Sequence, residues 1–328
     1  MAKLGVITDG ISTDFEHALK VMSENNLNQA ELQYLWDKEV GDLSKSEIEK
    51  AEELLKTYNM EVSCISRHNF TGVGVHEINI GDSTYTYHME KLKECIDMAQ
   101  RLDSPLVRIM SFRKEMVLFG EHGAEKWNVS DGAWNKLVEL LSPVVQLAKE
   151  SDIMLVVETG NNAMITSCYL GKKLIDDLGT KHLKILWDPA NALYCGESPS
   201  KNVLDSMKGG YLGHVHMKDV EVSIHKAKIR CVALGEGQMA PHLQTIADRL
   251  NNIGYDGSVS LESVYRPSEG GFEDGFNASI SKLPIISYKT STINKTIGNN
   301  TEESLHIGVN NGIVGEINQY INLSLIHI

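Results

Sequence analysis

Short apolar runs alternate with longer amphipathic stretches over most of the chain. The short runs have strand length, and the amphipathic stretches repeat their apolar residues at helical spacing. We expect strands at residues 4–7, 29–35, 60–65, 106–110, 153–157, 183–187, 212–217 and 258–261. We expect helices at residues 14–24, 44–58, 85–101, 130–150, 167–178, 201–207, 241–251 and 272–285. The second helix opens on the sequence SKSE, which predicts a capping box from Ser44 to Glu47.

Each of the eight expected strands is followed by an expected helix. Such alternation predicts right-handed βαβ units and a parallel sheet, and eight units are the number in a closed barrel. An open doubly wound sheet is the alternative, but the first turn, GVITDG, lacks its usual G-x-G-x-x-G phosphate loop. We therefore predict an α/β fold, a single-domain (β/α)8 TIM barrel formed by residues 1–286.

Residues 287–328 have a different composition from the rest of the chain. The stretch SYKTSTINKTIGNNTEES is rich in Ser, Thr, Asn and Gly and has no strong period, which is typical of disorder. The last six residues, LSLIHI, match the translation of a transposon-end sequencing adapter. We expect residues 287–328 to be a C-terminal extension that is disordered or not native.

Charge and cysteine content narrow the classes of function. The chain has 31 Lys and Arg against 44 Asp and Glu, a net charge of −13, which disfavours nucleic acid as a partner. The five Cys form no CxxC pair, so neither a disulfide framework nor a cysteine zinc site is expected. No apolar run is long enough for a membrane span or a signal peptide. We expect a cytoplasmic protein with no membrane partner.

Polar residues end the last four expected strands, where the catalytic residues of such barrels lie. IMLVVE ends at Glu158, LKILWD at Asp188 and VSLE at Glu262, while LGHVHMKD carries His214 and His216. A single acid at a strand end is as often a helix cap or a surface charge, but four consecutive strands predict one joint site. Three adjacent carboxylates would raise one another's pKa, and a divalent cation removes that conflict. The oxygen-rich donor set suits Mn, Mg or Co, with Zn as the alternative.

Two further observations concern the histidines and the earlier strands. His214 and His216 are two residues apart, so they point to the same side of their strand. His216 lies nearer the carboxyl end and is the expected metal ligand, whereas we expect His214 to be packed or hydrogen-bonded. His68 follows the third strand and Glu31 lies on the second, from which each could reach the barrel mouth.

The motifs VVETGN, LWDPAN, GHVHMKD, LGEGQM and VSLES, in this order, resemble those of a known family. The chain is similar over residues 3–283 to the xylose isomerase-like TIM barrels of the sugar phosphate isomerase/epimerase group. The resemblance implies one divalent metal ion held by Glu158, Asp188, His216 and Glu262. It also implies that Glu158 and Glu262 are the catalytic acid/base groups on opposite faces of a carbohydrate substrate.

Two positions depart from the pattern of the ketose epimerases in this family. Those enzymes commonly have a His three residues after the metal-binding Asp, and this chain has Asn191 there. They often carry an Arg six residues after the metal-binding His, where this chain has Val222. The departures argue against a free ketohexose as substrate and favour the broad sugar-isomerase branch with WDPAN and HMKD.

Other polar residues at the expected mouth are candidates for substrate contacts. We name His68, Arg108, Asn191, Lys218 and Glu236 as candidate substrate-binding residues. Arg108 is at the end of the fourth strand, Lys218 follows His216, and Glu236 lies between two glycines on the loop after the seventh strand. A salt bridge within the protein is the structural alternative for the charged members of this set.

The expected site fits proton abstraction next to the carbonyl of a metal-chelated sugar. We predict a sugar isomerase or epimerase, and the alternative is a dehydratase of a keto-inositol or an oxidised sugar. A three-metal endonuclease IV-like phosphodiesterase and a non-catalytic sugar-binding relative are less favoured, and homo-oligomerisation is left open.

Overall fold

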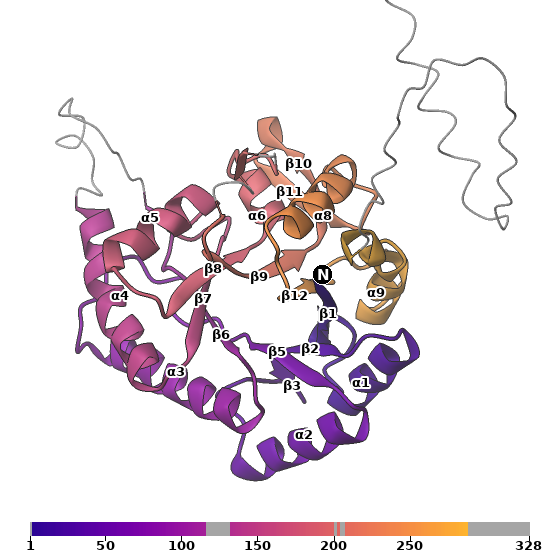
Figure 1. The fold of residues 1–328 in the computed structure, drawn as a ribbon, viewed down its shortest axis with the longest axis horizontal. Coiled ribbons are helices and arrows are strands. Elements are labelled where there is room, and N and C mark those ends of the chain that lie inside the picture. The colour runs from indigo at the N-terminus through magenta and orange to yellow at the C-terminus, as the bar shows by residue number, and fades with distance from the viewer. Residues whose placement is uncertain (1, 116–131, 200–201, 204–206, 288–328) are drawn as a thin grey trace, which may run out of the picture. The chain divides into compact units, whose positions relative to one another are not determined.

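The computed structural model describes residues 2–115, 132–199, 202–203 and 207–287. Eight parallel strands close into a barrel in the order β1-β12-β9-β8-β7-β6-β5-β2 (Figure 1). They are β1 (Lys3–Ile7), β2 (Gln29–Leu32), β5 (Glu61–Ile65), β6 (Leu106–Ile109), β7 (Met154–Glu158), β8 (Leu183–Trp187), β9 (Leu212–Met217) and β12 (Ser258–Leu261). The predicted (β/α)8 TIM barrel is confirmed.

Helices surround the ring of strands (Figure 1). They are α1 (Phe15–Glu24), α2 (Lys45–Thr57), α3 (Ser83–Arg101), α4 (Ala133–Glu150), α5 (Cys168–Leu178), α8 (Leu243–Asn252) and α9 (Phe272–Ile280). The capping box is present, since the Ser44 side chain accepts from the Glu47 backbone and the Glu47 carboxylate accepts from the Ser44 backbone. The expected helix at 201–207 lies largely outside the described residues.

Some elements differ from the sequence-based expectation. The strand expected at 29–35 ends at Leu32, and a short antiparallel pair follows it, β3 (Tyr34–Leu35) and β4 (Lys38–Glu39). The last expected helix ends at Ile280 and is followed by the 3-10 turn Leu283–Ser287. The second residue of that turn is a proline, which has no backbone N–H to extend an α-helix.

A hairpin and a short helix near the predicted site were not predicted from the sequence. The antiparallel strands β10 (Asp219–Ser223) and β11 (Lys228–Val232) form a hairpin directly after β9. The short helix α6 (Pro189–Tyr194) follows β8. Both elements lie at the carboxyl ends of barrel strands, where they flank the predicted site.

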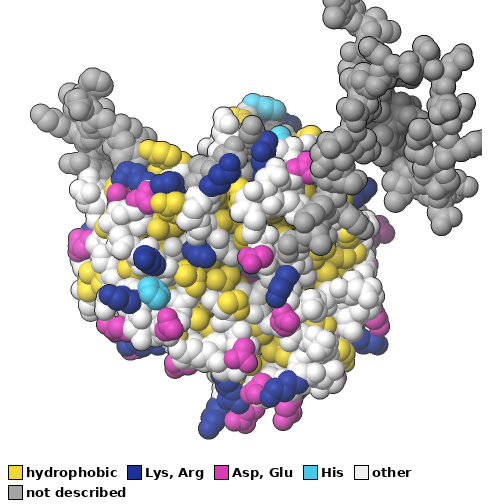
Figure 2. Space-filling model, viewed as in Figure 1, with side chains coloured by type: hydrophobic (Ala, Val, Ile, Leu, Met, Phe, Trp, Pro, Cys, Tyr) yellow, Lys and Arg dark blue, Asp and Glu magenta, His cyan; other side chains and the backbone are white. Residues whose placement is uncertain are grey.

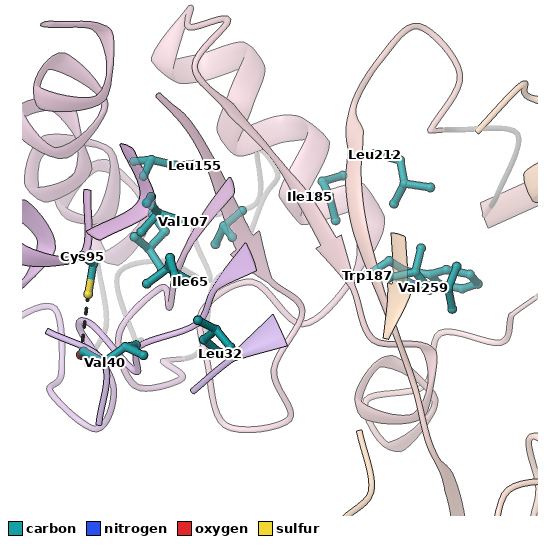
Figure 3. Packing of buried hydrophobic residues seen from close by; sticks show 14 of the residues in the cluster. Leu32, Val40, Ile65, Cys95, Val107, Leu155, Ile185, Trp187, Leu212 and Val259 are labelled. Atoms are coloured by element: carbon teal, nitrogen blue, oxygen red, sulfur yellow. Dashed lines mark hydrogen bonds between the residues drawn. The ribbon is translucent and has the colours of Figure 1, made fainter. Parts of the chain in front are cut away.

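The outward-facing residues of the strands form the main hydrophobic core. Val107, Leu155, Ile185 and Val259 are fully buried and belong to the cluster between barrel and helices (Figure 3). Val107 and Leu155 are register partners on neighbouring strands, so their side chains pack against each other. Inside the barrel a separate small cluster of Cys64, Val156 and Leu186 occupies the alternate positions.

Charged residues are interspersed on one face of the molecule. Figure 2 shows acidic and basic side chains mixed over the face drawn, so the net negative charge is not gathered into one patch there. Within the described part of the chain, no helix has the length and apolar character needed to cross a membrane.

Candidate functional site

The barrel brings the four predicted metal ligands together at the carboxyl ends of its strands. Glu158 is the last residue of β7, His216 lies near the end of β9, and Asp188 and Glu262 directly follow β8 and β12. One ligand atom from each residue lies within 4.8 Å of the ligand atoms of the other three. We call these four residues the quartet.

The donor set of the quartet fits a divalent cation. The His216 Nδ1 atom is buried and has no hydrogen-bond partner. It faces two carboxylates, 3.7 Å from Glu158 Oε1 and 3.6 Å from Glu262 Oε2. A buried imidazole nitrogen without a partner is costly unless it binds a ligand, and three carboxylates complete an oxygen-rich set around it.

Lys218 lies against two members of the quartet. Its Nζ is 2.6 Å from Asp188 Oδ2 and 2.6 Å from Glu262 Oε2, and the side chain is nearly buried. The sequence placed Lys218 among the substrate-binding candidates. The structure puts its ammonium where it offsets the charge of two carboxylates and donates to both.

Arg108 pairs with a third member of the quartet. Its Nη1 donates to Glu158 Oε2 at 2.9 Å, and its Nη2 donates to the Ser66 carbonyl oxygen at 2.7 Å and to Gln33 Oε1 at 3.1 Å. The guanidinium is fully buried. Every carboxylate of the quartet therefore has a cationic neighbour. Arg108 forms an ion pair with Glu158, and Lys218 forms ion pairs with Asp188 and Glu262.

These two cations correct the expected pKa pattern. Mutual repulsion was expected to raise the pKa of all three carboxylates. Of the three, only Asp188 has a raised pKa, of about 7, and the main cause is burial, which outweighs the attraction of Lys218. Burial also opposes ionisation of Glu158, yet Arg108 and His216 hold its pKa well below the ordinary value. For Glu262, burial is outweighed by Lys218 and His216, which lower its pKa.

The sequence WDPAN shapes the site around Asp188. Asp188 is the N-cap of α6, and its Oδ1 accepts from the backbone N–H groups of Ala190 and Asn191, each at 3.0 Å. Pro189 occupies the first turn, where its fixed φ favours helix initiation. The Asn191 amide then donates to Asp188 Oδ2 at 2.8 Å and to Glu158 Oε1 at 3.3 Å. Asn191 is thus in direct contact with two members of the quartet.

Glu31 on β2 contacts both histidines of β9, a role that the sequence did not indicate. It is fully buried, and its Oε1 lies 2.8 Å from His216 Nε2. Its Oε2 lies 2.7 Å from His214 Nε2, which also lies 3.1 Å from Ser260 Oγ. His214 is hydrogen-bonded, in agreement with its expected role. The available signal for Glu31 was an acid within the buried strand QAEL.

Two substrate-binding candidates lie apart from the quartet. His68 Nδ1 is 2.8 Å from Glu39 Oε1, and the His68 ring is partly exposed. Glu236 is exposed on the loop after β11. Neither has a hydrogen bond or ion pair with the quartet among the described residues, so their roles stay predictions.

The loop that carries Glu236 is fixed by Asp219. The Asp219 carboxylate is buried and accepts from the backbone N–H groups of Gly235, Gly237 and Met239 at 2.9, 2.9 and 2.8 Å. A Cβ atom at Gly237 would overlap the same carboxylate. Asp219 directly follows Lys218, so its carboxylate ties this loop to the chain segment that carries Lys218.

Comparisons with known proteins agree with this architecture. The family model described as "Xylose isomerase-like TIM barrel" matches residues 19–282. No curated protein matches the chain significantly. The likenesses to solved structures that follow all show less than 25% identity, so they bear on the fold alone.

Three solved structures illustrate the range of similar proteins. The probable 3-DHS dehydratase AsbF of Bacillus anthracis has a TM-score of 0.64 at 16% identity, over 88% of this chain and 100% of that chain. The 3-keto-D-glucoside 4-epimerase YcjR of E. coli has a TM-score of 0.62 at 15% identity, over 84% and 98%. A xylose isomerase-like TIM barrel protein of Mycobacterium smegmatis, solved in complex with magnesium, has a TM-score of 0.58 at 14% identity, over 83% and 88%.

Proposed function

Since the chain belongs to the xylose isomerase-like TIM barrel family, we propose that it is a metal-dependent sugar isomerase or epimerase. In this proposal it removes a proton from the carbon next to a carbonyl of a sugar or sugar derivative. The observation that carries the proposal is the quartet, of which Glu262 is partly exposed and the other members are buried, with the unpartnered Nδ1 of His216 facing two of its carboxylates.

The quartet would hold one divalent metal ion. Glu158, Asp188, His216 and Glu262 supply three carboxylates and one imidazole, a donor set suited to Mn, Mg or Co, with Zn as the alternative. When bound, such an ion supplies Lewis-acid polarisation of a carbonyl and offsets negative charge that develops on its oxygen. The magnesium in the M. smegmatis structure is consistent with this choice.

Glu158 and Glu262 supply the acid/base pair. Buried cations keep both carboxylates ionised near neutral pH, so either can accept a proton. They come from different strands, and their oxygens lie at 3.7 and 3.6 Å from the same nitrogen of His216. One carboxylate takes the proton from the carbon, and the other returns to the opposite face of that carbon a proton that it has first received from solvent, which yields an epimer. Return to the neighbouring carbon instead yields an aldose–ketose isomer.

The polar neighbours of the quartet would bind the substrate. The ammonium of Lys218 and the amide of Asn191 both donate to carboxylates of the quartet, so hydroxyl groups of a chelated sugar would come within their reach. In this assignment both residues are substrate-binding, and they hold hydroxyl oxygens next to the reacting carbon.

A dehydratase is the second candidate, and Lys218 is the observation that favours it. Elimination requires an acid that protonates a leaving hydroxyl close to the base that removes the proton. The buried ammonium of Lys218 lies 2.6 Å from Glu262 Oε2 and could donate such a proton. The substrates in that case are keto-inositols or oxidised sugars, whose carbonyl acidifies the neighbouring carbon.

The deciding experiment is a substrate panel in heavy water followed by NMR. Ketoses, keto-inositols and oxidised glycosides are incubated with Mn²⁺-loaded protein, with EDTA-treated protein, and with EDTA-treated protein to which Mn²⁺ is returned. We expect deuterium at one carbon of one substrate class, its loss with EDTA and its recovery with Mn²⁺. An inverted centre indicates an epimerase, and loss of water indicates a dehydratase.

Metal analysis of the same samples separates the remaining classes. One ion per chain agrees with the proposal, three ions favour an endonuclease IV-like phosphodiesterase, and no ion favours a non-catalytic sugar-binding relative. Full activity of metal-free protein would contradict the metal dependence proposed here.

A further inference from the structure

Glu31 contacts the quartet without being one of its members. Its carboxylate is fully buried and uses its two oxygens on two different imidazoles, Oε1 on His216 and Oε2 on His214. It comes from β2, whereas the quartet comes from β7, β8, β9 and β12, so it approaches His216 from across the barrel. The acid/base chemistry proposed above does not use this residue.

We propose that Glu31 is a positioning residue that presents His216 Nδ1 to the metal ion and thereby sets the metal affinity of the site. The inference rests on the proposed function, because it presumes a divalent ion in the quartet. Glu31 itself lies behind the imidazole and takes no part in ligation.

The hydrogen-bond geometry determines which nitrogen of His216 faces the quartet. A carboxylate accepts hydrogen bonds and cannot donate them, so the proton of each bond lies on the Nε2 of the histidine. His216 Nε2 is 2.8 Å from Glu31 Oε1, which leaves Nδ1 as the nitrogen that carries the lone pair in the neutral ring. That nitrogen faces Glu158 and Glu262. A carboxylate that fixes the tautomer of a metal-binding histidine also raises its basicity.

Glu31 is itself held in place. Ser66 donates its hydroxyl to Glu31 Oε1, and the Ser66 carbonyl oxygen accepts from Arg108, which bonds Glu158. The second imidazole, His214, is anchored by Ser260 Oγ at 3.1 Å. These bonds restrict the rotation of the carboxylate, so the orientation of His216 follows from the barrel itself.

A second metal ion is the competing interpretation of this cluster. One ligand atom from each of Glu31, His214 and His216 also lies within 4.8 Å of the other two. Both Glu31 oxygens, however, are at hydrogen-bond distance from an Nε2, at 2.8 and 2.7 Å. This arrangement satisfies the carboxylate through hydrogen bonds alone, and the metal stoichiometry distinguishes the two interpretations.

The first test is Mn²⁺ binding by the Glu31→Gln variant. A glutamine side chain has one acceptor oxygen and one donor amide, so it can accept from only one of the two Nε2–H groups. We expect Mn²⁺ binding weaker by about 10- to 100-fold in calorimetry, with the stoichiometry still one. The matched control is Glu61→Gln, which makes the same change on β5 at a carboxylate bonded to Lys3 and Gln29. It should bind Mn²⁺ as the wild type does.

The second test uses the wild type and needs no folded variant. In NMR spectra of Mg²⁺-loaded protein with ¹⁵N-labelled histidine, His216 should show a protonated Nε2 and a ligated Nδ1. A protonated Nδ1 with a ligated Nε2 would overturn the inference, even if Glu31→Gln failed to fold.

The outcomes separate this inference from the proposed function. Wild-type protein that binds no Mn²⁺ would overturn the metal-dependent function together with the inference. One ion per chain with the same affinity in the wild type and Glu31→Gln would overturn the inference and leave the function standing. Two ions per chain would assign Glu31, His214 and His216 to a second metal site instead.

Discussion

The two faces of the same barrel strands are built on different principles. On the outward face, Val107, Leu155 and Ile185 are fully buried apolar side chains that pack between the barrel and the helices. On the inward face at the carboxyl ends, Glu158 and His216 are as deeply buried, yet both are ionisable. Burial alone therefore does not distinguish the core from the candidate site.

The two faces differ in whether burying their side chains carries a free-energy cost that must be compensated. Apolar burial on the outer face is favourable by itself, at about 25 cal/mol per Å². Charged burial on the inner face requires a partner of opposite sign, and Arg108 and Lys218 supply one to each carboxylate of the quartet. We expect outer-face changes to act on stability and inner-face changes to act on chemistry.

The largest expected effect is the loss of turnover in Glu262→Gln. The amide cannot accept the substrate proton, while Lys218 keeps its second partner, Asp188. We expect deuterium exchange slower by about 10²- to 10⁴-fold with a nearly unchanged melting temperature. Glu53→Gln, exposed on α2, is the matched control. Wild-type exchange rates in Glu262→Gln would remove Glu262 from the acid/base pair.

The next largest effect is expected from Leu155→Ala on the outer face of β7, and it falls on stability instead of turnover. Leu155 is fully buried, so the truncation leaves a cavity and should lower the free energy of unfolding by about 2–5 kcal/mol. Urea denaturation measures this change. Mn²⁺ affinity and exchange rate at a temperature where the variant stays folded should equal the wild-type values. A selective loss of metal binding in the folded variant would contradict the expectation that outer-face changes act on stability alone.

The smallest expected effect is a fall in Mn²⁺ affinity as the pH is lowered, and it tests the inner face alone. Asp188 has its pKa raised to about 7 by burial, against the pull of Lys218, so a proton competes with a metal ion below that pH. Mn²⁺ affinity should fall by at least about tenfold per pH unit below about 7. Calorimetry in buffers of different ionisation enthalpy should show proton release on binding. An affinity that does not change between about pH 5 and 8 would contradict this assignment.

The same pKa shift has a consequence for the metal-free protein. Because the folded state binds the Asp188 proton more tightly than the unfolded chain does, this proton stabilises the fold. That contribution is fully present below the ordinary pKa of 3.8 and is lost as the pH rises through about 7.

The strands and the quartet could be predicted because their signals are local. Each barrel strand is a short apolar run, and each ligand sits at or next to its carboxyl end, so the barrel topology alone brings Glu158, Asp188, His216 and Glu262 together. Helix α6 had a local signal as well, an Asp N-cap followed by Pro in WDPAN, although no helix was expected there. The β10–β11 hairpin also had one, the alternation of apolar residues at Val220 and Val222.

The pairings inside the barrel could not be predicted, because they depend on distant strands. Arg108 and Lys218 were assigned to the substrate since nothing in their local sequence indicates a carboxylate partner 50 or 44 residues away. Glu31 meets His216 at a separation of 185 residues. These contacts follow from the closure of the barrel, and they reversed the expected pKa shift of two carboxylates.

The loop held by Asp219 has a consequence for how this barrel can be altered. One carboxylate organises the turn through main-chain groups, so the sequence of that turn is free to vary wherever its side chains point outward. Gly235 and Gly237 are not free to vary, because one has a φ of +91° and the other leaves no room for a side chain. A library that randomises Glu236 while keeping both glycines, together with Gln238, whose side-chain amide is hydrogen-bonded to the backbone of Val222, would thus be a route to new specificity at low risk to folding.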